Sequence, residues 1–193
     1  MSYQQKVAIV LGNGTTRKQV DLSTLVGSAP LFGCNALYRD FDDWDYLVAI
    51  DDGMIKELRK QHFKGTLIIP PNDERWEDPE YSMHRRRSNA GMNALQEAIR
   101  REHTILYCLG FDFLLKGNIS TDNVYKGSEN YGPETHANQN DNYHRIKYLQ
   151  WFARKHSDTK FVFVFPDNTE KHGVDSGNVY FMDTEVFLNK VSH

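Results

Sequence analysis

Short apolar runs recur along the chain, and glycine, proline, asparagine or aspartate bounds most of them. Runs of this length without polar alternation are typical of strands that are buried on both faces of a parallel sheet. The strands predicted in this way are Lys6–Leu11, Pro30–Cys34, Asp45–Ile50, Gly65–Ile69, Thr104–Leu109 and Lys160–Phe165.

Between several of these strands the apolar residues recur at helical spacing, which predicts helices at Asp52–His62, Ser88–Glu102 and Asp141–His156. Strands that alternate with helices predict an α/β fold of Rossmann-like type, with a mostly parallel sheet and helices on both faces. We expect one domain over residues 1–193. At the C-terminal end, the apolar positions around 179–181 and 186–188 predict a short edge strand and a closing helix.

The composition indicates a soluble globular protein, because hydrophobic residues make up 39% and charged residues 25% of the chain. A formal charge of −3 argues against a mainly electrostatic nucleic-acid binder. No apolar run approaches the ~20 residues that a membrane span needs. The first strand follows the N-terminus too closely for a signal peptide, which favours a cytoplasmic location. Cys34 and Cys108 are accordingly expected to be buried, reduced thiols.

The first strand ends abruptly in Gly12-Asn13-Gly14, followed by Thr15 and Thr16. Glycine adopts positive φ without strain and lets a ligand approach the main chain, so both roles are expected of Gly12 and Gly14. A threonine there would cap a following helix, whose free N–H groups attract phosphate. This turn therefore indicates a nucleotide site, although a simple β–α connection has the same appearance.

Three other predicted strands end in polar residues: Cys34-Asn35, Asp51-Asp52-Gly53 and Gly110-Phe111-Asp112. The carboxyl ends of parallel strands share one edge of the sheet, and ligands of open α/β sheets bind along that edge. The amides of Asn13 and Asn35 can donate to phosphate or read a base or sugar. They can equally satisfy the backbone of their own turns.

Further charged groups lie near this edge. Asp51-Asp52 resembles the acidic pair with which many nucleotide-sugar enzymes hold Mg²⁺ or Mn²⁺, but Asp52 could simply cap the next helix while Asp51 orders the turn. The run Arg85–Arg87 precedes a predicted helix and forms either an anion site or a solvated face. His136 and His144 flank an asparagine-rich segment, and a neutral imidazole there can accept a hydroxyl proton.

Two stretches, Pro70–Arg87 and Gly117–Asn142, show no periodicity. Structureless loops of more than roughly 15 residues are usually lids, binding loops or disordered segments. Because each follows a strand, both begin at the same edge of the sheet. We expect a lid or acceptor loop at residues 117–142.

Several motifs, taken in order, resemble one family. They are Gly12-Asn13-Gly14, Lys18-Gln19-Val20-Asp21, Cys34-Asn35-Ala36-Leu37-Tyr38, Arg87-Ser88-Asn89-Ala90-Gly91 and the run Ile105–Phe113. This order is similar to that of the bacterial lipooligosaccharide sialyltransferases, which are CMP-sialic-acid-dependent glycosyltransferases with a GT-A-like, Rossmann-type fold. The pterin-diphosphokinase-like proteins share the opening turn and the Gly-Phe-Asp signature.

The resemblance assigns roles to individual positions. The candidate nucleotide-binding residues are Gly12, Asn13, Gly14, Asn35, Asp51, Arg87, Asn89, Gly91 and Asp112. The family's catalytic histidine corresponds to His136, or to His144 as second choice. Two tyrosines that hold the departing phosphate in the family align with Leu114 and Ser120 here, so Tyr125 or Tyr131 would have to replace them. Ala90 likewise stands where the family has a serine.

The resemblance implies transfer of a sugar from a CMP-activated donor to the hydroxyl of a glycan acceptor. No metal or other cofactor is then required, and no nucleic acid is a partner. Exposed aromatic residues such as Trp76, Tyr81 and Trp151 would support a homo-oligomer. One alternative is an Mg²⁺-dependent diphosphokinase, in which Asp51, Asp52 and Asp112 would have to converge. Another is a non-catalytic nucleotide-binding module.

Overall fold

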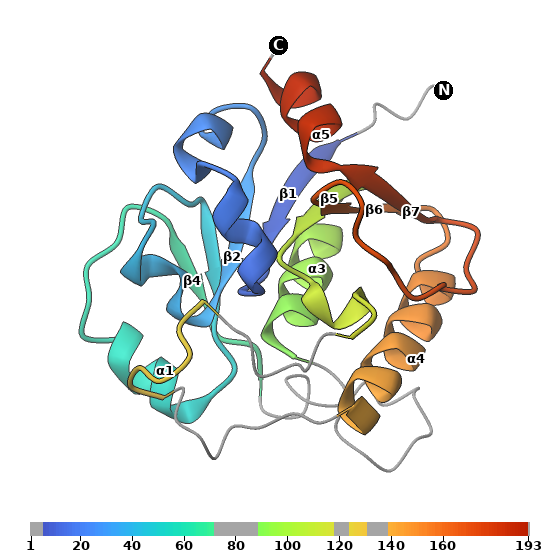
Figure 1. The fold of residues 1–193 in the computed structure, drawn as a ribbon. Helices are drawn as coiled ribbons and strands as arrows, with labels where there is room; N and C mark the ends of the chain where they lie inside the picture. Colours follow the sequence, from blue (N-terminus) through green and yellow to red (C-terminus); the bar gives the residue numbers. More distant parts are fainter. Residues whose placement is uncertain (1–5, 72–88, 118–123, 131–138, 193) are drawn as a thin grey trace.

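A single parallel sheet organises the protein (Figure 1). The computed structural model describes residues 6–71, 89–117, 124–130 and 139–192. Within these ranges, seven strands follow the order β4-β3-β2-β1-β5-β6-β7, and every neighbouring pair is parallel. The strands are β1 (Val7–Leu11), β2 (Leu31–Cys34), β3 (Tyr46–Val48), β4 (Thr66–Ile68), β5 (Ile105–Leu109), β6 (Lys160–Phe165) and β7 (Val179–Asp183). The predicted α/β, Rossmann-like fold is confirmed.

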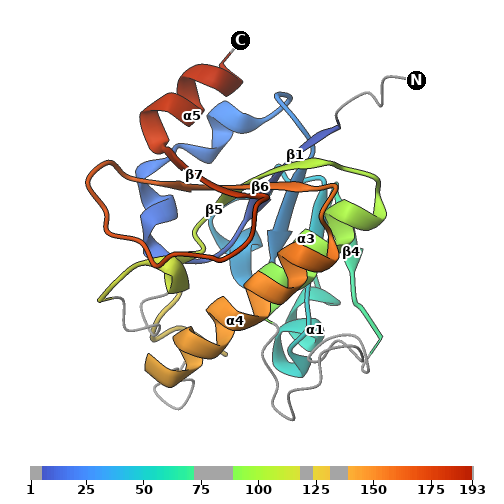
Figure 2. The same ribbon diagram turned by 90° about the vertical axis from the view of Figure 1, so that its right-hand side faces the viewer.

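Helices cover both faces of the sheet, as Figure 2 shows from the side. Helices α3 (Ala90–Arg100) and α4 (Gln139–Lys155) pack on one face, against alternate strand residues that include Ala8 and Val10. Their neighbours Ile9 and Leu11 point to the other face. That face is covered by the 3₁₀ helices η1 (Thr15–Gln19) and η2 (Leu22–Leu25), by α1 (Asp52–Leu58) and by α5 (Thr184–Val191).

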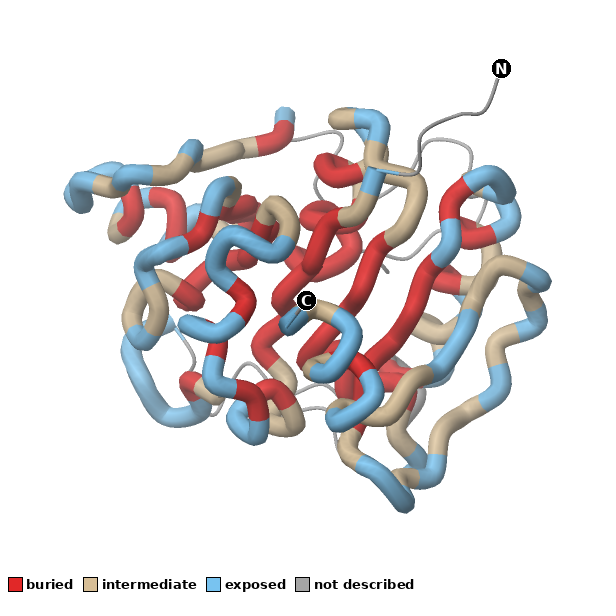
Figure 3. The backbone as a smooth tube through the Cα atoms, turned by 90° about the horizontal axis from the view of Figure 1, so that it is seen from above, coloured by how far each residue is buried: buried red, intermediate tan, exposed pale blue. Residues whose placement is uncertain are grey.

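The central strands are buried on both faces, as the red segments of Figure 3 show. This explains why they have apolar residues at consecutive positions. The C-terminal prediction is also confirmed, since β7 is the edge strand and α5 follows it directly. No helix in the described ranges is both long and apolar enough to cross a membrane.

The bounds of all three predicted helices differ from the observed ones, most at the following ends. Helix α1 ends at Leu58, because the polar residues after it offer no apolar face to the sheet. Helix α3 begins at Ala90, where Asn89 caps it. Helix α4 begins at Gln139, so the end of the predicted loop 117–142 is helical, and residues 124–130 form turns packed on the protein.

The order of the strands reverses beside β1. The chain runs outward from β1 through β2 and β3 to β4, and then returns to place β5 on the other side of β1. In open α/β sheets, ligands bind outside the carboxyl ends of the strands at such a switch point. The fold therefore directs attention to the residues that follow β1, β2 and β5.

Candidate functional site

Two glycine turns meet at the switch point. The N–H of Gly12 donates to the carbonyl of Leu109 (2.7 Å), and that of Gly14 donates to the carbonyl of Gly110 (2.9 Å). A Cβ on Gly12 would lie 2.6 Å from the Gly110 oxygen. Positive φ occurs at Gly110 (+74°) and not at Gly12 or Gly14, so that expectation was wrong. Glycine is therefore required at these positions after β1 so that the two turns can pack against each other.

Asp112 joins the turn after β5 to η1. Its carboxylate accepts from the Thr16 N–H (3.0 Å) and from the hydroxyls of Thr16 and Thr15. A Cβ on Gly14 would lie 2.3 Å from Asp112 Cγ, so the glycine admits this carboxylate. Burial raises the pKa of Asp112, against the bonds from Thr16 and Thr15 that lower it. The predicted threonine cap was wrong, because Gly14 occupies the cap position and both hydroxyls face Asp112.

Two asparagines line the carboxyl edge, and each leaves a buried oxygen unsatisfied. Asn13 donates through Nδ2 to the Cys34 carbonyl (3.0 Å), and Asn35 donates through Nδ2 to Asp51 Oδ2 (2.9 Å). Because both acceptors require an N–H, they fix the orientation of the two amides. The Oδ1 atoms of Asn13 and Asn35 are buried and have no hydrogen-bond partner among the described residues.

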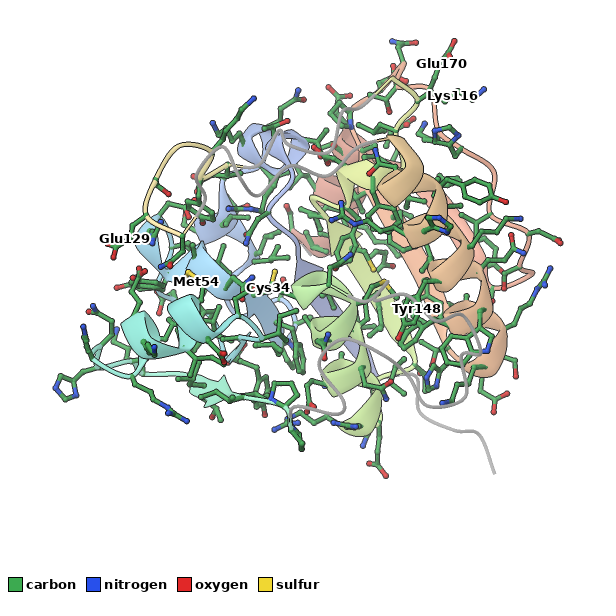
Figure 4. The ribbon with its side chains drawn as sticks, turned by 90° about the horizontal axis from the view of Figure 1, so that it is seen from below. Cys34, Met54, Lys116, Glu129, Tyr148 and Glu170 are labelled. Carbon is green, nitrogen blue, oxygen red and sulfur yellow. The ribbon has the colours of Figure 1, made fainter. Side chains whose placement is uncertain are left out.

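Local backbone geometry sets these side chains in place. Asn35 is the first residue after β2 and has φ of +48°, a left-handed conformation that asparagine tolerates better than most residues. Its amide thereby reaches Asp51, which precedes α1 at the end of β3. Asn13, Cys34, Asn35 and Asp51 thus form a continuous line across the ends of β1, β2 and β3. We call these four residues the asparagine edge. Figure 4 views this side of the molecule, with Cys34 near its centre.

Asp51 and Asp52 do not have the roles expected from helix capping. Asp51 is the residue at the cap position of α1, but its side chain makes no capping hydrogen bond and accepts from Asn35. Asp52 is the first helical residue, so the prediction that it caps the helix was wrong. Among the described residues, no group of three or more His, Cys, Asp or Glu is arranged to hold a metal ion. A diphosphokinase would need the carboxylates of Asp51, Asp52 and Asp112 to lie together around Mg²⁺. Asp51 accepts from Asn35 and Asp112 accepts from η1, and the described residues contain no such group of carboxylates.

The first turn of α3 packs on the same side of the sheet as Cys34. Asn89 Oδ1 accepts from the Met92 N–H (3.0 Å), which caps the helix. A Cβ on Gly91 would lie 2.9 Å from the Phe111 ring, so glycine permits α3 to pack on Phe111. The polar groups of Asn89 and the small size of Gly91 therefore have structural roles. Arg87, which was expected here, lies outside the described residues.

The candidate catalytic and phosphate-binding residues are only partly described. His144 is half-buried in the first turns of α4, and its ring lies edge-on to that of Tyr143 at 5.4 Å. His136 and Tyr131 lie outside the described residues. The hydroxyl of Tyr125 bonds to Arg17 and Asp40. Leu114, at a position where the family has a tyrosine, is fully buried in the core.

The sequence analysis missed the charged groups behind the asparagine edge. Arg17 is 3% exposed and bonds to Asp40, while Arg39 bonds to Glu57 through both carboxylate oxygens. No local signal identifies these pairs, since Arg17 and Arg39 lie in 3₁₀ helices without a regular apolar face. Their partners are 18 to 108 residues away in sequence.

The reactivity of the Cys34 thiol tests whether this residue is buried as the structure shows. Burial raises the pKa of its thiol to about 12, with a lowering contribution from Arg17 and a further raising one from Asp51. At pH 8 the reactive thiolate is then about 10⁻⁴ of the total. We expect the native protein to resist iodoacetamide at Cys34 and Cys108, both buried and free, until it unfolds.

Mass spectrometry of the alkylated protein, with and without denaturant, measures this difference. A Ser157→Cys variant, with its new thiol on the exposed surface, is the control and should be labelled without denaturant. Labelling of native Cys34 at the rate of that exposed thiol would contradict the buried placement.

Comparison with known proteins shows similarity in fold to a solved structure. No protein-family model matches the chain, and no curated protein matches it in sequence. Among solved structures, it is similar to the crystal structure of the sialyltransferase CST-II in complex with a trisaccharide acceptor and CMP. The TM-score is 0.52 at 13% sequence identity, over 97% of this chain and 99% of that one. The likeness therefore shows a fold shared with that structure over nearly the whole chain.

Proposed function

We propose that this protein is a glycosyltransferase that transfers a sugar from a CMP-activated donor to an acceptor hydroxyl. The observation that carries the proposal is the pair of unsatisfied, buried oxygens on Asn13 and Asn35 at the switch point. An unpaired buried acceptor costs about 1–3 kcal/mol, which a ligand bringing N–H or O–H groups would recover. The full-length likeness to a protein whose crystal complex contains CMP supports this choice of ligand.

The chemistry of the edge suggests how CMP would lie. Asn13 Oδ1, Asn35 Oδ1 and the Asp51 carboxylate are all acceptors, so they suit ribose hydroxyls or the cytosine amino group. Phosphate oxygens are also acceptors and would be disfavoured there. The positive end of the α3 dipole favours an anion, and Arg87 precedes that helix in sequence. We therefore assign Asn13 and Asn35 to the nucleoside, and the first turn of α3 to the phosphate.

Transfer would then proceed with departure of CMP from the anomeric carbon of the donor. Cationic and N–H groups stabilise the charge that develops on the departing phosphate, an effect often worth several kcal/mol. A histidine accepts the proton of the attacking hydroxyl and contributes roughly 10²–10⁴-fold in rate. His136 and His144 are the two candidates for this base.

Single His136→Asn and His144→Asn variants test the proposal. We expect one of them to lower CMP release from a CMP-activated nine-carbon sugar acid by about 10²–10⁴-fold in the presence of acceptor saccharides. Its affinity for CMP should stay near that of the wild type, since the base contacts the acceptor. His62→Asn, on the exposed residues after α1, is the control.

Full transfer by both variants would show that neither histidine is the base. Wild-type protein that binds CMP but releases none from the donor with any acceptor saccharide would instead be a non-catalytic nucleotide-binding module.

A further inference from the structure

Arg17, Asp40 and Tyr125 form a triad beside the asparagine edge, in which Arg17 and Tyr125 are buried and Asp40 is exposed. Arg17 donates from Nη1 to Asp40 Oδ2 (3.2 Å) and from Nη2 to the Tyr125 hydroxyl (3.0 Å). The same hydroxyl donates to the other carboxylate oxygen of Asp40. Each member therefore contacts the other two, although they come from η1, from the residue after the 3₁₀ helix η3 (Asn35–Arg39) and from the segment Val124–Asn130.

A second cluster of hydrogen bonds joins the rest of the segment Val124–Asn130 to Arg39 and to α1. Arg39 binds Glu57 of α1 through two guanidinium nitrogens (2.8 and 3.0 Å) and also donates to Ser128 Oγ (2.7 Å). Asn130 donates to the second oxygen of Glu57 (2.9 Å). A Cβ on Gly53 would lie 2.3 Å from Asn130 Oδ1, so the glycine in the first turn of α1 makes room for this contact.

The segment Val124–Asn130 contacts the asparagine edge through its first residue. The N–H of Val124 donates to the backbone carbonyl of Asn13 (2.9 Å). Tyr125, the next residue, carries the hydroxyl of the triad. The segment runs beside α1 in Figure 1, and the labelled Glu129 and Met54 lie on the same side of Cys34 in Figure 4. The triad and the Val124 bond together join the Asn13 turn and η1 to the segment Val124–Asn130.

We propose that Arg17 and Tyr125 are positioning residues, which hold the Asn13 turn against Val124–Asn130 and thereby set the affinity for the donor nucleotide. The inference rests on the proposed function, because it assumes that Asn13 contacts the nucleotide. Neither residue touches the ligand. They act through the backbone of Asn13, whose Oδ1 must meet a donor with the geometry of a hydrogen bond.

The chemistry of the triad favours this role over simple stabilisation. A buried guanidinium is costly to desolvate, and apolar side chains of similar volume often stabilise a protein as well or better. What the polar network adds is a preferred arrangement of the groups it joins, and within it Arg17 Nε has no hydrogen-bond partner among the described residues. Here those groups include the segment next to Asn13, and the planar fork of arginine holds carboxylate and hydroxyl at once.

Tyr125→Phe tests the inference, because it removes the hydroxyl and keeps the ring. Tyr180→Phe is the matched control, since Tyr180 lies exposed on the edge strand β7 and its hydroxyl bonds, among the described residues, only to the Gly177 carbonyl. We expect Tyr125→Phe to raise the hydrogen-exchange rate of the Val124 amide and to weaken CMP binding by about tenfold. Affinity is measured by calorimetry well below the melting temperature. Arg17→Lys, which keeps the charge without the fork, should weaken binding as well.

The outcomes separate the inference from the function on which it rests. A purely structural triad would lower the melting temperature and leave the affinity of the folded protein unchanged, and that result would overturn the inference alone. Unchanged exchange at Val124 in Tyr125→Phe would also overturn it. Wild-type protein that binds no CMP would overturn the proposed function, and the inference with it.

Discussion

Replacing Gly110 by alanine is expected to lower the free energy of unfolding by about 2–5 kcal/mol. The residue has φ of +74°, a conformation that costs an L-residue roughly 1–2 kcal/mol. The added Cβ would also lie 2.6 Å from the Gly12 carbonyl oxygen and 2.9 Å from its carbon. Both atoms belong to backbone that is hydrogen-bonded to β5, so neither can move aside cheaply, and overpacking typically adds 1–3 kcal/mol. Urea denaturation measures the change.

Two other glycines separate these contributions. Gly117 has φ of +73°, but among the described residues no atom lies within 4 Å of a Cβ, so Gly117→Ala should show the backbone strain alone. Gly173 has neither positive φ nor a close neighbour, and Gly173→Ala should leave stability within about 0.5 kcal/mol of the wild type. Equal losses at Gly110 and Gly117 would mean that the two turns at the switch point do not touch.

Replacing Asn35 by glycine is expected to weaken CMP binding by about 10- to 100-fold. Glycine keeps the left-handed backbone at this position (φ +48°), so the turn after β2 is preserved. The substitution removes the unsatisfied Oδ1 and the Nδ2 that donates to Asp51. Loss of one or two ligand hydrogen bonds corresponds to roughly 1–3 kcal/mol of binding free energy. Calorimetric titration with CMP gives the change directly.

Asn168 supplies the matched control, because it too has a left-handed backbone (φ +60°) and is exposed in the loop after β6. Its side chain bonds to the adjacent Asp167, two strands away from β1 in the sheet. Asn168→Gly should bind CMP as the wild type does. Equal affinities of Asn35→Gly and Asn168→Gly would remove Asn35 from the site.

The sheet was predictable because strands that are buried on both faces have apolar residues at consecutive positions, which is a local pattern in the sequence. Each predicted strand is present, and Lys160–Phe165 has the predicted bounds. The helix ends were harder to predict, since they depend on whether the neighbouring residues pack on the sheet. The polar residues after Leu58 do not extend the packed face of α1, whereas the packing of α4 on the strands accompanies a start at Gln139. The parallel pairing of β7 with β6 also depends on a long connection whose composition carries no periodic signal.

The proximity of the candidate site residues was predictable and their individual contacts less so, while their binding of a nucleotide stays a prediction. The rule that ligands bind at the carboxyl edge located Asn13, Asn35 and Asp51 correctly on one line. The positive φ was predicted at the wrong glycines, and sequence alone does not show that Gly12 and Gly14 make room for the neighbouring turn. The Arg17 triad joins residues up to 108 positions apart, and only the folded chain brings them together.

Calorimetric titration of the wild-type protein with CMP measures whether the asparagine edge binds this nucleotide. We expect saturable binding of one CMP per chain, with the same affinity in the presence of Mg²⁺ and of a chelator. We also expect Asn35→Gly to weaken this binding and Asn168→Gly to leave it unchanged. Absence of CMP binding, or binding of ATP alone and only with Mg²⁺, would contradict the proposal that this edge binds CMP.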